Sequence, residues 1–123
     1  MTRAFALGAL FAMASVVPAA AGKVDSGVRG TVTLGPTASV CRVDKPCSRP
    51  YATRIVVRNA RTGQRVSVVH SDEQGRFRVR LRPGRYRLRA MGDRPFPSCQ
   101  EVTARVHRHR FKQVSIDCDT GIR

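Results

Sequence analysis

The sequence predicts an all-β protein, a seven-stranded antiparallel β-sandwich of Greek-key type, and two observations support this. Beyond residue 21, apolar and polar side chains alternate with a period of two, and clusters of Gly, Pro, Asn and Asp separate the alternating segments. Short amphipathic strands at regular spacing are typical of two sheets packed face to face. The predicted strands are residues 28–34, 53–59, 65–70, 76–81, 85–90, 101–106 and 112–118.

The apolar members of these strands define the expected core. Phe77 and Tyr86 are its aromatic residues, each flanked by outward-facing arginines. We expect the inward faces of neighbouring strands to match, which pairs the apolar set of 53–59 with Val66 and Val68. The same rule pairs Val102 with Ile116 in the last two strands.

The first 21 residues have the layout of a secretory signal peptide. Arg3 supplies a positive start, residues 4–17 are uncharged and largely apolar, and the small residues Ala19 to Ala21 form a cleavage pattern. The apolar run is too short to span a bilayer. We therefore expect a secreted or extracytoplasmic protein without a transmembrane segment. Residues 22–123 form one domain with a Pro- and Cys-containing loop at 35–50.

The four cysteines of an exported chain favour two disulfides. Of three connectivities, we favour Cys41–Cys47 and Cys99–Cys118. The second pair conflicts with the Val102–Ile116 register, which puts Cys99 and Cys118 on opposite faces of a sheet. That bond requires either a bulge or a Cys99 that precedes its strand, so this pairing stays open.

A longer motif runs from Ser71 to Leu88 and reads Ser/Thr-Asp-x-x-Gly-x-Phe-x-Val-x-Leu-x-Pro-Gly-x-Tyr-x-Leu. With Gly27 to Val32 as a first strand, it resembles the carboxypeptidase regulatory-like domains, which belong with the transthyretin-like and Cna-B-type sandwiches. The resemblance covers about residues 27–118. It implies a transthyretin-like (prealbumin-like) fold and an accessory or binding module rather than an enzyme.

The transthyretin-like family also includes hydroxyisourate hydrolases, so a small hydrolase is a third hypothesis. The characteristic Tyr-Arg-Gly-Ser ending of those enzymes is absent, because the chain ends Asp-Thr-Gly-Ile-Arg. A pocket lined by His and Arg together would favour this hypothesis, and we do not expect one.

Positive charge is the strongest compositional feature: 23 Lys and Arg against 8 Asp and Glu give a formal net charge of +15. We expect Pro83-Gly84 to close a hairpin that sets Arg80 opposite Arg87 and Arg78 opposite Arg89. Like charges directly opposite destabilise a strand pair, which favours one arginine-rich face that binds polyanions. The candidate residues are Arg76, Arg78, Arg80, Arg85, Arg87 and Arg89.

A competing interpretation is a solvated outer face in an organism whose genome favours arginine codons, since only three basic residues are lysines. The expected partners are an anionic envelope polymer, a glycan or another protein. Recognition of a protein would use a sheet edge or the 35–50 loop. The oligomeric state stays open.

Nucleic acid is disfavoured, because the chain is exported and its hairpin aromatics point inward rather than toward bases. We expect no cofactor and no metal. His107 and His109 could join Cys99 or Cys118 at a metal, but Arg108 and Arg110 would repel a cation.

Overall fold

The computed structural model describes residues 24–92 and 95–123, and it contains only strands, turns and loops over these ranges. The predicted signal peptide, residues 1–21, lies outside the described residues. Within them, no helix has the length and apolarity needed to cross a membrane. The described chain forms two sheets that pack face to face, so the predicted β-sandwich is confirmed.

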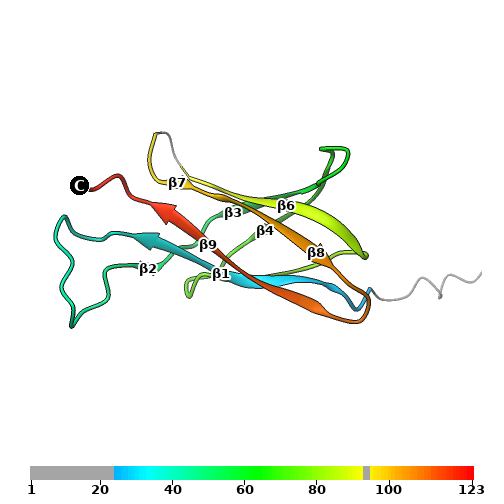
Figure 1. Cartoon of the computed structure of the whole chain (residues 1–123), viewed down its shortest axis with the longest axis horizontal. Helices are drawn as coiled ribbons and strands as arrows, with labels where there is room; N and C mark the ends of the chain where they lie inside the picture. Colours follow the sequence, from blue (N-terminus) through cyan, green and yellow to red (C-terminus); the bar gives the residue numbers. More distant parts are fainter. Residues whose placement is uncertain (1–23, 93–94) are drawn as a thin grey trace, which may run out of the picture.

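The five-stranded sheet is built around β1 (Gly27–Gly35). Two strands run antiparallel to β1 along one side: β5 (Arg76–Arg80) and the short β2 (Arg49–Pro50). Along its other side β9 (Phe111–Asp119) runs parallel to β1, as Figure 1 shows. The short β7 (Ser98–Cys99) pairs with the end of β9.

The four-stranded sheet has the order β4-β3-β6-β8, and all its neighbours are antiparallel. Its strands are β4 (Arg65–His70), β3 (Arg54–Asn59), β6 (Gly84–Met91) and β8 (Glu101–Val106).

All seven predicted strands are present, and β2 and β7 are short additions. Three expectations about pairing were wrong. The sandwich is not purely antiparallel, because β1 and β9 run in the same direction. The last two strands do not pair, because β8 and β9 belong to different sheets: Val102 lies opposite Leu88, and Ile116 lies opposite Val32.

The connection from β5 to β6 also crosses between the sheets, so it is not the predicted hairpin. At the end of β5, the Leu81 amide donates to the Ser26 carbonyl at 2.9 Å, and the buried Ser26 hydroxyl donates to the Leu81 carbonyl at 2.7 Å. At the start of β6, the Tyr86 hydroxyl donates to the Arg82 carbonyl at 2.7 Å. These bonds hold the chain against β1 and then direct it into the other sheet.

The turn before β5 has the geometry that its sequence predicts. The Asp72 carboxylate accepts the backbone N–H groups of Gln74 and Arg76, both at 2.9 Å. Gly75 has a φ of 75°, a conformation that glycine adopts without strain. A Cβ there would lie 2.4 Å from the Val32 carbonyl oxygen, so the turn also needs glycine for its close approach to β1.

The core fills the space between the two sheets. Ile55 and Leu88 from one sheet and Val32 and Ile116 from the other are fully buried. Phe77 and Tyr86 are also buried there, as predicted. Fully burying a side chain of this size stabilises a fold by about 1.5–3 kcal/mol, so this layer is the main source of stability.

The predicted inward face of β4 was wrong. Ser67 and Val69 lie opposite the inward-facing residues of β3, whereas Val66 and Val68 are 45% and 40% exposed on the outer surface. The register shifts beside Arg58, where Val66 is the extra residue of a bulge. A shift of one residue exchanges the two faces of a strand.

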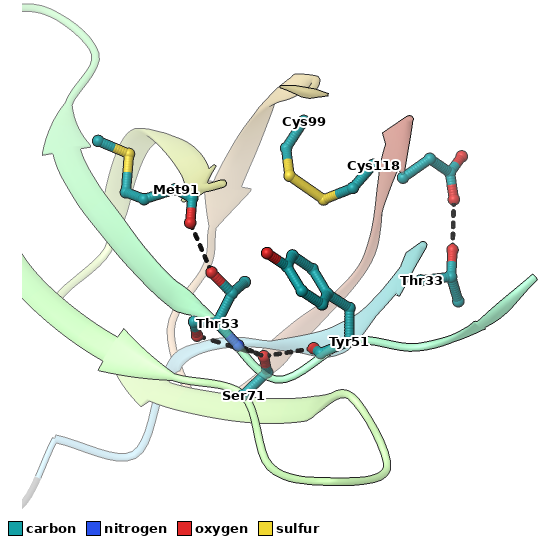
Figure 2. Close-up of a disulfide and its surroundings, with 8 residues drawn as sticks. Thr33, Tyr51, Thr53, Ser71, Met91, Cys99 and Cys118 are labelled. Atoms are coloured by element: carbon teal, nitrogen blue, oxygen red, sulfur yellow. Dashed lines mark hydrogen bonds between the residues drawn. A yellow bond between two sulfur atoms is a disulfide. The ribbon is translucent and has the colours of Figure 1, made fainter. Parts of the chain in front are cut away.

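Both predicted disulfides form, Cys41–Cys47 in the 35–50 loop and Cys99–Cys118 between the short β7 and the end of β9. Cys99 lies directly opposite Cys118 and precedes β8, which removes the conflict of register. Figure 2 shows this bond above the ring of Tyr51, which packs against the core.

Tyr86→Phe tests the crossing between β5 and β6. We expect it to lower the free energy of unfolding by about 1 kcal/mol, because it removes one hydrogen bond and leaves its acceptor. Tyr51→Phe is the matched control, since no hydrogen bond joins the Tyr51 hydroxyl to another residue that the structure describes. Urea denaturation of both variants measures the difference, and equal stability would contradict this role of Tyr86.

Candidate functional site

The six candidate arginines do not form one face. Residues Arg76, Arg78 and Arg80 lie on β5 in the five-stranded sheet, and the other three lie on β6 in the four-stranded sheet. Each strand turns its arginines away from the shared core. The predicted oppositions of Arg80 with Arg87 and of Arg78 with Arg89 were therefore wrong, and the two sets point to opposite sides of the sandwich.

Seven arginines, including the three of β6, cover the outer surface of the four-stranded sheet. We call this surface the β6 face. Each of its strands contributes at least one arginine at an outward position, and these side chains are exposed except for Arg87, which is half-buried. The β6 face consists of Arg54, Arg58, Arg65, Arg85, Arg87, Arg89 and Arg105, with Val56, Val66 and Val68 between them.

Several arginines of the β6 face lie directly opposite one another. Arg58 is opposite Arg87 on one side and Arg65 on the other, and Arg85 is opposite Arg105. Glu101, opposite Arg89, is the acidic residue in register with this set. Such like-charged pairs destabilise a sheet, so the β6 face carries a repulsion that a bound anion would relieve.

No arginine of the β6 face has a carboxylate partner within the described residues. The ion pairs of the described residues are Arg42–Asp44, His109–Asp25 and Arg123–Asp119, and all three lie outside the β6 face. Arg58 Nη1 donates to the Gly63 carbonyl at 3.3 Å, and Arg87 Nε is buried without a hydrogen-bond partner in the described chain.

The apolar residues of the β6 face explain how it tolerates this charge. Val56 points outward with its strand neighbours Val68 and Arg89 on either side, yet it is only 3% exposed. The stems of neighbouring arginines can cover such a residue while their guanidinium groups stay in water. The β6 face therefore combines an apolar base with a cationic surface.

The outer surface of the five-stranded sheet carries the smaller set, Arg29, Arg76, Arg78 and Arg80, which we call the β5 face. Arg29 lies directly opposite Arg78. The Arg78 guanidinium carbon lies 4.1 Å from the centre of the Phe111 ring, a cation–π contact that limits its mobility. Arg29, Arg76 and Arg78 line a shallow groove with Thr31 and Gln113.

Asp72 also lines this groove, and its carboxylate oxygen Oδ1 accepts the two backbone bonds of its own turn. It forms no ion pair with the arginines within the described residues.

Sequence reasoning missed Arg29, Arg54, Arg58, Arg65 and Arg105, because it considered only the supposed hairpin. Their signal was present in the alternation: Arg54 and Arg58 flank the buried run of β3, and Arg105 lies between Ala104 and Val106. If the outward positions of every predicted strand had been assigned from the alternation, most arginines of the β6 face would have been identified.

The other candidate chemistry does not assemble. Cys99 and Cys118 are bonded to each other, and the described residues contain no group of three His, Cys, Asp or Glu side chains able to hold a metal. A shallow hollow does bring His107 together with Arg105, Arg108 and Arg110, contrary to expectation. These four side chains are exposed, and no hydrogen bond to another described residue orients His107.

Two carboxylates with a lowered pKa belong to surface ion pairs. A hydrogen bond with His109 holds the pKa of Asp25 below its ordinary value, and a hydrogen bond from Arg123 does the same for the pKa of Asp119. Burial raises the pKa of Tyr86, whose hydroxyl donates to the Arg82 carbonyl. Local contacts of the fold account for each of these shifts.

The sequence matches no protein-family model and no curated protein. Among solved structures, a minor pilin of the gram-positive pathogen Streptococcus agalactiae matches with a TM-score of 0.57 and 13% identity, over 78% of this chain and 45% of the pilin chain. A Bacillus anthracis TIE protein aligns with a TM-score of 0.44 and 18% identity, over 76% of this chain and 18% of its own. The chain thus spans less than half of the pilin, with which it shares a β-sandwich fold.

The opposed arginines make a prediction about stability. Arg85→Glu/Arg87→Glu places each new carboxylate opposite an arginine, Arg105 and Arg58 respectively. We expect the free energy of unfolding at low ionic strength to rise by about 1 kcal/mol. The gain should shrink in about 1 M salt, where the Debye length falls to about 3 Å. Denaturant titrations at both ionic strengths measure it, and a loss of stability at low salt would contradict the proposed repulsion.

Proposed function

We propose that this chain is an exported, non-catalytic β-sandwich module that binds an anionic envelope polymer or glycan through the β6 face. Residues 1–21 are its leader, and residues 22–123 form one module of the carboxypeptidase regulatory-like class. The observation that carries the proposal is a set of seven arginines, several directly opposed, without a carboxylate partner in the described chain.

The shape of the β6 face supports an extended ligand. Its arginines come from four neighbouring strands and stand at outward positions of a sheet surface. A surface of one sign of charge raises the local concentration of anions and steers them to it. Carboxylate, sulfate or phosphate groups accept paired hydrogen bonds from guanidinium groups, so a polymer carrying such groups at intervals would contact several arginines at once.

The two disulfides support an extracytoplasmic location, since such bonds persist in oxidising compartments. The hydrolase hypothesis has less support, because the described residues around the hollow beside His107 show no hydrogen-bonded nucleophile–base pair, which is the signature of nucleophilic catalysis.

A protein partner is the second candidate, and the 35–50 loop favours it. Val40 and Val43 are strongly exposed there, beside the Cys41–Cys47 bond that constrains the loop. Contacts through these valines would be apolar and nearly independent of salt, whereas binding through the β6 face would weaken as salt rises. Salt dependence therefore separates the two functions.

Arg85→Glu/Arg87→Glu tests the proposed function. We expect the affinity for polygalacturonate, a carboxylated polysaccharide, to fall about tenfold or more, equivalent to about 1.4 kcal/mol. Wild-type affinity should itself fall steeply with salt, because each contact is a screened charge pair. Titration calorimetry at two salt concentrations measures both effects.

The matched control is Arg42→Glu/Lys45→Glu, which removes the same charge from the exposed 35–50 loop, beyond the end of β1 (Figure 1). This variant should keep wild-type affinity. The proposal fails if the β6-face variant binds as tightly as wild type, or if both variants lose the same affinity.

A further inference from the structure

We infer that the β5 and β6 faces each hold an anionic polymer strand, so that one copy of the chain cross-links two strands. The inference rests on the proposed function, which requires only the β6 face. It adds a second binding surface on the opposite side of the molecule, so that two ligands are held on opposite sides.

The topology places the two faces on opposite sides. β5 belongs to one sheet and β6 to the other, and both direct their apolar residues into the shared core. Their arginines therefore extend away from each other. Packed sheets lie about 10 Å apart, and the guanidinium groups stand further out on each side. A single polymer strand lying flat on one face cannot reach the other face.

Screening makes the two faces nearly independent. The Debye length is about 8 Å at physiological ionic strength, which is less than the separation of the two sets of guanidinium groups. An anion bound to the β6 face therefore leaves most of the positive potential of the β5 face in place. Both faces can be occupied at once, as cross-linking requires.

The β5 face has the features of a binding surface of its own. Arg29 and Arg78 are directly opposed, and Arg76 and Gln113 extend the same groove with further donors. The contact with Phe111 holds the Arg78 guanidinium in place, so less side-chain entropy is lost when an anion binds. Asp72 adds one negative charge to this groove, but the three arginines outnumber it and can donate hydrogen bonds to carboxylate, sulfate or phosphate groups.

The test uses polygalacturonate in two pools, one labelled with a donor fluorophore and one with an acceptor. Adding wild-type protein should bring strands of the two pools together and produce energy transfer. The signal should pass through a maximum and fall at excess protein, when each strand is covered by its own copies. High salt should abolish it.

Arg29→Glu/Arg76→Glu removes charge from the β5 face, and its new carboxylate at position 29 faces Arg78, which favours the fold. We expect this variant to bind polymer within about threefold of wild type and to lose energy transfer about tenfold or more. Arg85→Glu/Arg87→Glu should lose energy transfer as well and keep only the weaker binding of the smaller, intact β5 face. The loop variant Arg42→Glu/Lys45→Glu should cross-link like wild type.

Each outcome decides one claim. If wild type binds without energy transfer, or if the β5-face variant cross-links like wild type, the inference is wrong and the proposed function stands. If all three charge variants lose cross-linking equally, simple charge neutralisation explains it and the inference is wrong. If the β6-face variant binds like wild type, the proposed function itself fails. Arg76→Gln/Arg80→Gln, which adds no carboxylate, repeats the β5-face test, and the circular dichroism spectrum of each variant checks its fold.

Discussion

The crossing of the chain between β5 and β6 is held by hydrogen bonds at both of its ends. The reciprocal bonds between Ser26 and Leu81 keep the end of β5 against β1, and the bond from Tyr86 to the Arg82 carbonyl directs β6 into the opposite sheet. The alternation of arginine with apolar residues continues on both sides of this crossing. Because outward means opposite directions in the two sheets, one continuous sequence pattern produces two separate cationic faces.

The free energy gained by burying the core offsets the repulsion between the opposed arginines. A like-charged pair across two strands costs up to about 1 kcal/mol, whereas each fully buried aliphatic side chain contributes about 1.5–3 kcal/mol. The buried layer around Ile55, Leu88 and Ile116 therefore outweighs the repulsion between opposed arginines. The repulsion that remains favours any ligand that neutralises it, so binding of a polyanion and stabilisation of the fold are linked in the same direction.

The strands and most of the core could be predicted from the alternation alone, because each strand has one buried and one solvated face. Pairing was harder to predict. The run Val66-Ser67-Val68-Val69 allows either face to turn inward, and the bulge opposite Arg58 decides between them. Pro83-Gly84 is compatible with a hairpin and with a crossing, and the contacts that distinguish the two include bonds to the distant Ser26, which the local sequence does not reveal. The resemblance to carboxypeptidase regulatory-like domains predicted the class of fold but not the partition of the arginines.

The spacing of the cations argues for the kind of ligand. Outward residues two apart in a strand lie about 6.7 Å from each other, and neighbouring strands are about 4.8 Å apart. The β6 face is thus a grid of positive charges on a sheet surface, and the half-open hollow that Val56, Arg58 and Arg89 line there also contains the Glu101 carboxylate, which opposes a small anion. A single carboxylate or phosphate would engage one or two arginines there and remain largely hydrated. A polymer with repeated charges would engage several, and the contacts after the first would be intramolecular, so the proposed binding would depend on charge repeat and chain length more than on the chemistry of one group.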